Sequence, residues 1–240
     1  HSLFSDVIVG LNCIRAPAKL TLKSKNSKPS IDILEAKLFV RRVKVDQSVT
    51  LGHQIGLSKQ NAIYPIKSKE VVSFTMSTGS SSFYKEQLFG DRRLPNFILV
   101  TFQSADSYLG TFSTSSSEFE HFNLTSLTLS KNTDYREKYT QDFQSNNYTT
   151  SYVQSLIRNL GYLDKNMNCG ITLEEFKTKY PFFTFVLAPD FDLNQSQLPQ
   201  QGNLKLDIKF ATPLVESAYV IIYGVFENEI QVTSNHTILL

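Results

Sequence analysis

The feature that most constrains this sequence is a pair of strand patterns near its C-terminal end. In Leu204–Phe210, apolar residues alternate with charged ones, which predicts a strand with one solvent face and one buried face. Ala218–Phe226 is instead an unbroken apolar run rich in β-branched and aromatic residues, and such a run favours a strand covered on both faces. Pro213 lies between them and suits a turn, because it lacks an N–H and has a fixed φ.

Several other segments carry strand patterns. We expect strands in Ile31–Val45, Val71–Met76, Phe97–Phe102, Phe122–Leu129 and Phe182–Leu187. A slip in the alternation near Ala36 predicts a bulge or bend in the first of them. The chain has 240 residues, enough for one large sandwich or two small domains. Because there is no clear linker between the strand patterns, a single β-sandwich is the simplest architecture.

Helical patterns are fewer. Thr149–Leu160 places apolar side chains at the spacing of one helix face and is followed by Gly161, which predicts an amphipathic helix with a glycine stop. Ser48–Lys59 is a second short helical pattern, and it contains two glycines. Asn132–Asn147 is polar with spaced aromatic residues, so we expect loop there rather than strand.

Composition and motif content argue against most enzymatic and binding classes. The net charge of +2 is too small to indicate nucleic-acid binding by itself. Cys13 and Cys169 are too far apart in sequence for a disulfide framework or a metal motif. The histidines are scattered, and the sequence has neither a nucleophile elbow nor a phosphate-binding glycine loop. We therefore expect no catalytic residues, no cofactor, no sequence-specific nucleic-acid binding and, with no long apolar run, no membrane span.

One loop mimics a calcium-binding EF-hand. Oxygen-bearing side chains stand at its first, third, fifth and twelfth places, namely Asp164, Asn166, Asn168 and Glu175. The sixth place, where the sharp turn requires glycine, holds Cys169 instead. Only one of the first five places is acidic. We therefore interpret the segment as an Asn- and Gly-rich loop between a helix and a strand, and we assign no metal site.

Four stretches share their order and spacing with one family of proteins. They are LEAKLFVRRVKVDQSVTLGHQIGLSKQNAIYPIKSKEVVSFTMSTG (Leu34–Gly79), FEHFNLTSLTLS (Phe119–Ser130), FFTFVLAPDF (Phe182–Phe191) and QGNLKLDIKFATPLVESAYVIIYGVFENEIQV (Gln201–Val232). Together they resemble the major capsid, or hexon, proteins of Polinton/Maverick elements and adintoviruses. The stretch from Lys131 to Gly170 matches that family only loosely.

The resemblance implies an all-β jelly-roll sandwich of eight strands in two packed antiparallel sheets, with long loops and one or two short helices. Residues 1–240 would form a single jelly-roll domain, the second of a double-jelly-roll capsid protein, with a loop and helix insertion around residues 131–180. Such proteins assemble as trimers with a pseudo-hexagonal outline. The implied partners are other copies of the chain, in the trimer and in neighbouring capsomers, and penton or other minor capsid proteins. The implied location is a virion assembled in the host nucleus or cytoplasm.

A jelly roll also gives a reason for the two C-terminal patterns. Its last two strands lie inside opposite sheets, so the outer face of Ala218–Phe226 would be an exposed apolar patch in an isolated domain. We predict that one of two alternative sets packs on a second jelly roll or on a neighbouring subunit. The sets are Tyr219, Ile221 and Tyr223, or Val220, Ile222 and Val225. Gly224 would mark a bulge that shifts the phase of the strand.

Two functions compete at this point. The first is a self-assembling structural capsid protein, and the second is a β-sandwich module that binds carbohydrate or calcium through Phe143–Tyr152 or Asp164–Glu175. An enzyme ranks below both. The first function predicts trimers or larger assemblies, whereas the second predicts a monomer whose melting temperature rises with ligand.

Overall fold

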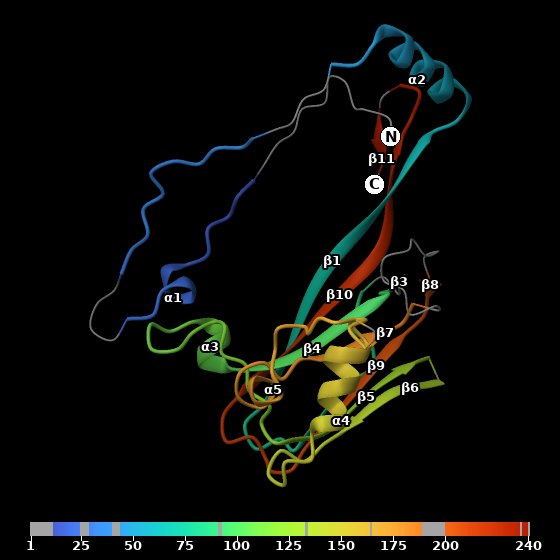
Figure 1. The fold of residues 1–240 in the computed structure, drawn as a ribbon. Coiled ribbons are helices and arrows are strands. Elements are labelled where there is room, and N and C mark those ends of the chain that lie inside the picture. The colour runs from blue at the N-terminus through green and yellow to red at the C-terminus, as the bar shows by residue number, and fades with distance from the viewer. Residues whose placement is uncertain are drawn as a thin grey trace.

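The computed structural model describes residues 12–24, 29–39, 44–90, 93–132, 134–163, 165–188, 200–235 and 237–239. Its longer strands form two antiparallel sheets (Figure 1). The first sheet has the order β1 (Ala62–Met76), β10 (Ala218–Val232), β4 (Phe97–Ser104), β7 (Phe183–Val186), with β11 (Ile238–Leu239) beside the end of β10. The second has the order β2 (Ser82–Lys85), β9 (Leu204–Phe210), β5 (Leu124–Lys131), β6 (Asp134–Thr140). A separate small pair joins β3 (Arg93–Leu94) to β8 (Gln200–Gln201).

The order of the strands identifies the fold as a jelly roll. Leaving aside the two-residue strands, the described chain has eight strands, and the first sheet contains the first, eighth, third and sixth of them in that order. The second sheet contains the second, seventh, fourth and fifth. This is the eight-stranded, double-sheet winding of a jelly roll. The predicted fold class is therefore confirmed, and the last two long strands do lie inside opposite sheets.

The core lies between the two sheets and is built from alternate residues. In β9, Leu206 and Ile208 are fully buried, while the lysines and the aspartate between the apolar residues are more accessible. Val220 and Ile222 of β10 meet them from the opposite sheet and are fully buried as well. The alternation of β9 therefore confirms the amphipathic strand predicted from its sequence.

Two of the helices precede β1, and the others lie in the connections between strands. They are α1 (Ala18–Thr21), α2 (Gln47–Lys59), α3 (Ala105–Leu109), α4 (Thr149–Tyr152), the π-helix η1 (Val153–Arg158) and α5 (Leu173–Thr178). The predicted helix over Thr149–Leu160 is confirmed as α4 continuing into η1. The second predicted helix is confirmed as α2, whose first turn is capped by the Asp46 carboxylate accepting from the Ser48 N–H.

Three predictions about the positions of helices and strands are wrong. The Asn- and Gly-rich loop leads into the helix α5 and not into a strand. Residues 31–39, 44 and 45 belong to no helix or strand, and residues 40–43 of that predicted strand lie outside the described residues. A strand pattern needs a neighbour to accept its hydrogen bonds, and within the described chain no strand lies beside this segment. Conversely, Asp134–Thr140 was expected to be loop but forms β6, because Tyr139 packs into the core and its neighbours pair with β5.

β1 and β10 extend beyond the rest of the sandwich as a two-stranded ribbon. They pair without interruption from Ala62 with Val232 to Met76 with Ala218, whereas β4 pairs with β10 only as far as Val225. Figure 1 shows the paired ends of β1 and β10 running together towards α2. At the point where the ribbon leaves the sandwich, buried Glu227 accepts from Asn96 Nδ2 at 2.9 Å and lies 3.7 Å from Lys67 Nζ.

Candidate subunit interface

The outer face of β10 carries one of the two residue sets predicted to form an interface. Val220 and Ile222 point between the sheets and have no exposed area, so they belong to the core and not to the outer face. Tyr219, Ile221 and Tyr223 alternate with them and are half-buried on the outside. The alternative that grouped Val220 and Ile222 is therefore excluded by their burial in the core.

The expected bulge at Gly224 is absent. The pairing of β10 with β1 and with β4 continues through Gly224 without a shift in register, so Val225 lies on the outer face with Tyr223. Gly224 is needed for a different reason. A Cβ atom built there would lie 2.7 Å from Cζ of Phe89, so the missing side chain makes room for that ring.

Neighbouring strands extend the apolar outer face. The register places Val71 of β1 and Leu99 of β4 directly beside Tyr223, and Val71 is 62% exposed. A small apolar cluster separate from the main core lies on the β4 side; its members are Phe97, Leu99, Leu160, Val186, Ala188, Tyr223 and Val225. We call this set, with Ile221 and Val71, the outer apolar face. Sequence analysis missed its β4 members, although the unbroken apolar run of Phe97–Phe102 meets the same criterion as β10.

One end of this face is covered by α3. The ring of Tyr108 stacks on Tyr219 with centroids 4.0 Å apart, and its hydroxyl lies 2.6 Å from Ser73 Oγ on β1. Tyr219 is therefore already partnered within the chain. This leaves Ile221, Tyr223 and Val225 as the predicted residues that are available to a neighbour.

The edge of the first sheet at β7 is closed by η1. Ser155 Oγ accepts from the Thr184 N–H at 2.9 Å and donates to the Phe182 carbonyl oxygen at 2.5 Å. Thr184 Oγ1 in turn donates to the Ser155 carbonyl oxygen at 2.6 Å. These bonds use backbone groups of the edge strand and so prevent another strand from pairing there.

Buried polar groups fix η1 in this position. The Tyr139 hydroxyl and Asn159 Nδ2 both donate to the Thr184 carbonyl oxygen. Burial raises the pKa of Tyr139 far above its ordinary value, and nearby Glu137 adds to this effect, so the hydroxyl stays a neutral donor. Burial also raises the pKa of Glu137, whose carboxylate accepts from Gln154. The network is structural, because every member serves to join η1 to β6 and β7.

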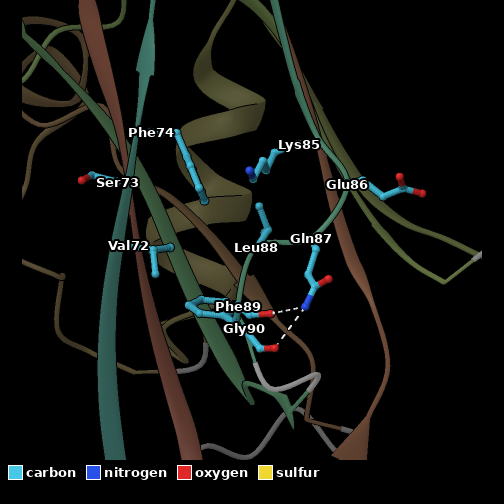
Figure 2. Close-up of a pocket in the computed structure, with 9 residues that line it drawn as sticks. All are labelled: Val72, Ser73, Phe74, Lys85, Glu86, Gln87, Leu88, Phe89 and Gly90. Carbon is cyan, nitrogen blue, oxygen red and sulfur yellow. Dashed lines mark hydrogen bonds between the residues drawn. The ribbon is translucent and has the colours of Figure 1, made fainter.

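The opposite side of the sandwich is open. β1 pairs with β10 along one edge and β2 pairs with β9 along one edge, and no other strand of the described residues pairs with either. A groove of about 620 Å³ lies between them. Figure 2 shows Val72, Phe74, Leu88 and Phe89 gathered at this groove, whereas Ser73 and Glu86 point away from it. Lys85 Nζ lies 4.7 Å from the centroid of the Phe74 ring.

A second hollow, of about 580 Å³, lies among loops at one end of the sandwich. His121 lines it, stacks on Phe143 with centroids 3.9 Å apart, and accepts from the Asn123 N–H through Nδ1 at 2.9 Å. Burial, helped by Lys177, lowers the pKa of His121 to about 4. Burial also raises the pKa of Glu120 in the same hollow.

The loop that mimics an EF-hand does not gather its described oxygen atoms around a common point. Asp164 lies outside the described residues. Asn168 Oδ1 accepts from the Cys169 N–H at 2.6 Å, and Glu175 completes a capping box with Thr172 at the start of α5. Within the described ranges, no group of three or more His, Cys, Asp or Glu side chains could hold a metal ion. No helix among the same residues is long and apolar enough to cross a membrane.

Comparisons with known proteins give structural neighbours only. No family model and no curated protein matches the chain. The solved structures that match include a chain of the Sputnik virophage determined by cryo-EM, with 14% identity, coverage of 75% of this chain and 38% of that chain, and a TM-score of 0.45. They also include VP54 of PBCV-1, fitted into a cryo-EM reconstruction of the virophage Sputnik, with 9% identity, coverage of 82% of this chain and 55% of that chain, and a TM-score of 0.47. A third is the mavirus major capsid protein, with 14% identity, coverage of 75% of this chain and 41% of that chain, and a TM-score of 0.36.

The match covers only part of each of these proteins. The chain spans between 38% and 55% of the length of the three solved chains. All three TM-scores are below 0.5, so the jelly-roll assignment is founded on the strand order described above. The similar structures are virophage and viral proteins, and one of them is named as a major capsid protein.

Proposed function

We propose that this chain is a structural capsid protein that self-associates through the outer apolar face. The order of its strands supports this proposal, because double-sheet jelly rolls are a common fold of viral capsid domains. The four stretches that resemble Polinton/Maverick and adintovirus major capsid proteins support it independently of the fold. In this proposal the chain is part of a virion and acts without catalytic residues.

The outer side of β10 is the observation that carries the proposal. β9 and β10 each lie inside a sheet, with strands on both edges. The outward side chains of β9 are Lys205, Asp207 and Lys209, as expected for a sheet that faces water. Those of β10 are apolar or aromatic. Because both strands are central, the difference reflects what faces each sheet, and an apolar outer face calls for a partner.

The size of the face indicates the kind of assembly. Full burial of an exposed apolar side chain contributes about 1.5–3 kcal/mol. Ile221 and Tyr223 are already half-buried and Val71 is partly covered, so completing their burial contributes less than this for each residue and only about offsets the lower end of the cost of about 4–15 kcal/mol for immobilising two partners. One such contact would therefore hold a pair weakly. A closed ring adds contacts without adding subunits. The resemblance to hexon-type capsid proteins implies that the ring is a trimer, and we propose the trimeric, pseudo-hexagonal capsomer of an icosahedral shell. The neighbour across the face would be a second jelly roll or another subunit, and penton or other minor capsid proteins would be further partners.

The proposal is tested with Ile221→Asp and a matched change on the solvent face of the other sheet, Lys209→Asp. Solution mass by light scattering and negative-stain images are recorded for each variant, together with the melting temperature. We expect Ile221→Asp to abolish trimers and larger particles with little change in melting temperature, and Lys209→Asp to assemble normally. If Ile221→Asp assembled normally but melted far lower, the residue would belong to the folding core and the proposal would be wrong.

A further inference from the structure

An amine, a carboxylate and a carboxamide meet where the ribbon leaves the sandwich. Lys67 lies on β1, Glu227 lies on the central strand β10, and Asn96 lies immediately before β4. Asn96 Nδ2 donates to Glu227 Oε1 at 2.9 Å, and Lys67 Nζ lies 3.7 Å from the same oxygen atom. One carboxylate oxygen therefore holds the amine and the carboxamide close to each other. These two groups can combine into an amide bond, with the carboxamide nitrogen leaving as ammonia.

The backbone of the first sheet places the three groups in a row. The register sets Lys67 directly opposite Glu227, and side chains opposite each other have Cβ atoms about 5 Å apart. On the other side of β10, the Asn96 N–H donates to the Val225 carbonyl oxygen at 2.7 Å. The Asn96 carbonyl oxygen accepts from the Leu187 N–H at 2.8 Å. The carboxamide is thus fixed beside the carboxylate before any reaction, as a fast intramolecular reaction requires.

The carboxylate and the carboxamide are shielded from water. The Glu227 side chain is 5% exposed and Asn96 is 7% exposed. The Lys67 side chain is 34% exposed, so it reaches the buried carboxylate from the surface. In a surface ion pair such as Lys23 with Glu118, both partners are instead exposed. Because water competes with an amine for the carboxamide carbon, a site that excludes water favours reaction with the amine.

We propose that Lys67 and Asn96 join in an intramolecular isopeptide bond, with Glu227 as the proton carrier. Glu227 takes a proton from the Lys67 ammonium, and the neutral Nζ attacks Cγ of Asn96. Glu227 then gives this proton to Nδ2 and takes a second proton from Nζ, while the Cγ–Nδ2 bond breaks. Ammonia leaves and carries the second proton into solvent as ammonium, so Glu227 is a carboxylate again. The bond between Nζ and Cγ remains, and the reaction needs no oxidant, reductant or cofactor.

The bond would tie β1 to the start of β4 across β10, at the root of the ribbon (Figure 1). A cross-link between residues distant in sequence stabilises a fold mainly by restricting the unfolded chain, as a disulfide does. The reaction occurs once in each chain and turns over no external substrate. None of the three reacting side chains belongs to the outer apolar face, so the inference does not depend on the proposed capsid function.

The mass of the intact full chain, measured after denaturation, tests the proposal. We expect the wild-type mass to fall below the sequence mass by one molecule of ammonia. Trypsin digestion should then give a branched peptide that contains both Lys67 and Asn96, because an acylated lysine is not cleaved. A wild-type chain that keeps the full sequence mass after days in the folded state overturns the proposal. Loss of ammonia without the branched peptide also overturns it, because ring closure at a single asparagine releases ammonia too.

Two variants remove the reacting groups with little change in shape. Lys67→Arg keeps the positive charge but not the amine, and Glu227→Gln still accepts from Asn96 but cannot carry the proton. Both should keep the full sequence mass, with circular dichroism showing that they are folded. The matched control is Lys69→Arg, two residues along the same face of β1, which should lose ammonia as the wild type does. If Lys67→Arg or Glu227→Gln lost ammonia as fast as the wild type, the proposal would be wrong.

A further variant separates this reaction from the proposed assembly. Ile221→Asp should lose ammonia and give the same branched peptide, although we expect it to form no trimers. That outcome would support the isopeptide bond whether or not the outer apolar face is a subunit interface. If Ile221→Asp stayed folded but kept the full sequence mass, the reaction would need assembled subunits and the proposal of a bond formed within one chain would be wrong.

Discussion

Acidification should destabilise the fold through His121. The imidazole is half-buried, stacked on Phe143, and its Nδ1 accepts from the Asn123 N–H. That bond holds an unusual piece of backbone, because Phe122 and Asn123 both have positive φ values, of 45° and 53°. Protonation of Nδ1 would replace an acceptor with a donor facing the Asn123 N–H. Lys177 adds a like charge that opposes the imidazolium.

The direction and size of the effect follow from the shifted pKa. Burial and Lys177 lower the pKa of His121 from 6.5 to about 4, so the unfolded state binds the proton more readily than the folded state. The stabilisation is present above pH 6.5 and is lost as the pH falls towards 4. A full shift over this range would correspond to about 3.4 kcal/mol at 1.36 kcal/mol per unit. Because the ring is only partly buried, screening by solvent reduces this to about 1–2 kcal/mol.

The assay compares two proteins by urea unfolding at pH 7 and pH 4.5. The control is His121→Gln, which keeps an acceptor near the Asn123 N–H but does not titrate. Glu120 and Glu137 have raised pKa values and act in the opposite direction, favouring the folded state as the pH falls. These carboxyl groups are present in both proteins, so their effect cancels in the difference. Between pH 7 and pH 4.5, we expect the free energy of unfolding to fall by about 1–2 kcal/mol more in the wild type than in His121→Gln. If the free energy of unfolding fell equally in the two proteins, the reasoning would be refuted.

Three further outcomes are expected. Gly224→Ala should lower the free energy of unfolding by about 1–3 kcal/mol, because the new methyl group collides with Phe89; an unchanged melting temperature would show that the ring can move aside. Tyr139→Phe should cost about 0.5–1.5 kcal/mol by urea unfolding, since Asn159 still donates to the Thr184 carbonyl oxygen; a loss of several kcal/mol would mean that the hydroxyl organises the whole network. Millimolar calcium should leave the melting temperature unchanged, because the Glu175 carboxylate is already bonded to Thr172 in the capping box of α5. A rise in melting temperature with calcium would show that the Asp164–Glu175 loop binds the ion.

The strands predicted best are those in which each face keeps the same environment, core, water or another apolar surface, from one end of the strand to the other. Leu204–Phe210 alternates because one side meets the core and the other meets water, and Phe97–Phe102 and Ala218–Phe226 are continuous because both sides meet apolar groups. These patterns are local, so the sequence is sufficient to detect them. β2 and β6 are short edge strands whose outer residues are exposed. The partner of β2 is β9, far away in the sequence, whereas β6 forms a hairpin with the adjacent β5. Nothing local distinguishes such segments from loops.

The interface residues could be predicted only as two alternative sets. An unbroken apolar run does not say which of its two faces points into the sandwich. In the structure that choice is fixed by contacts distant in sequence, such as the insertion of Phe89 over Gly224. Residues 31–39 do not form the predicted strand for a related reason. Their alternation is compatible with a strand, but a strand exists only where another supplies the hydrogen bonds.

The ribbon of β1 and β10 also has a mechanical consequence. Its hydrogen bonds run perpendicular to the strands, and β10 continues from the ribbon tip to the centre of the first sheet without a break in register. Tension applied to Ala62 along the ribbon would load all 15 residue pairs in shear at once. Tension that separates Ala62 from Val232 would open the pairs one after another. A neighbour attached through α2 could thus pull along the ribbon with a large force without separating the strands. A force that separates the strands at the tip would open the ribbon more easily, until the opening reached Glu227 and its hydrogen bond from Asn96.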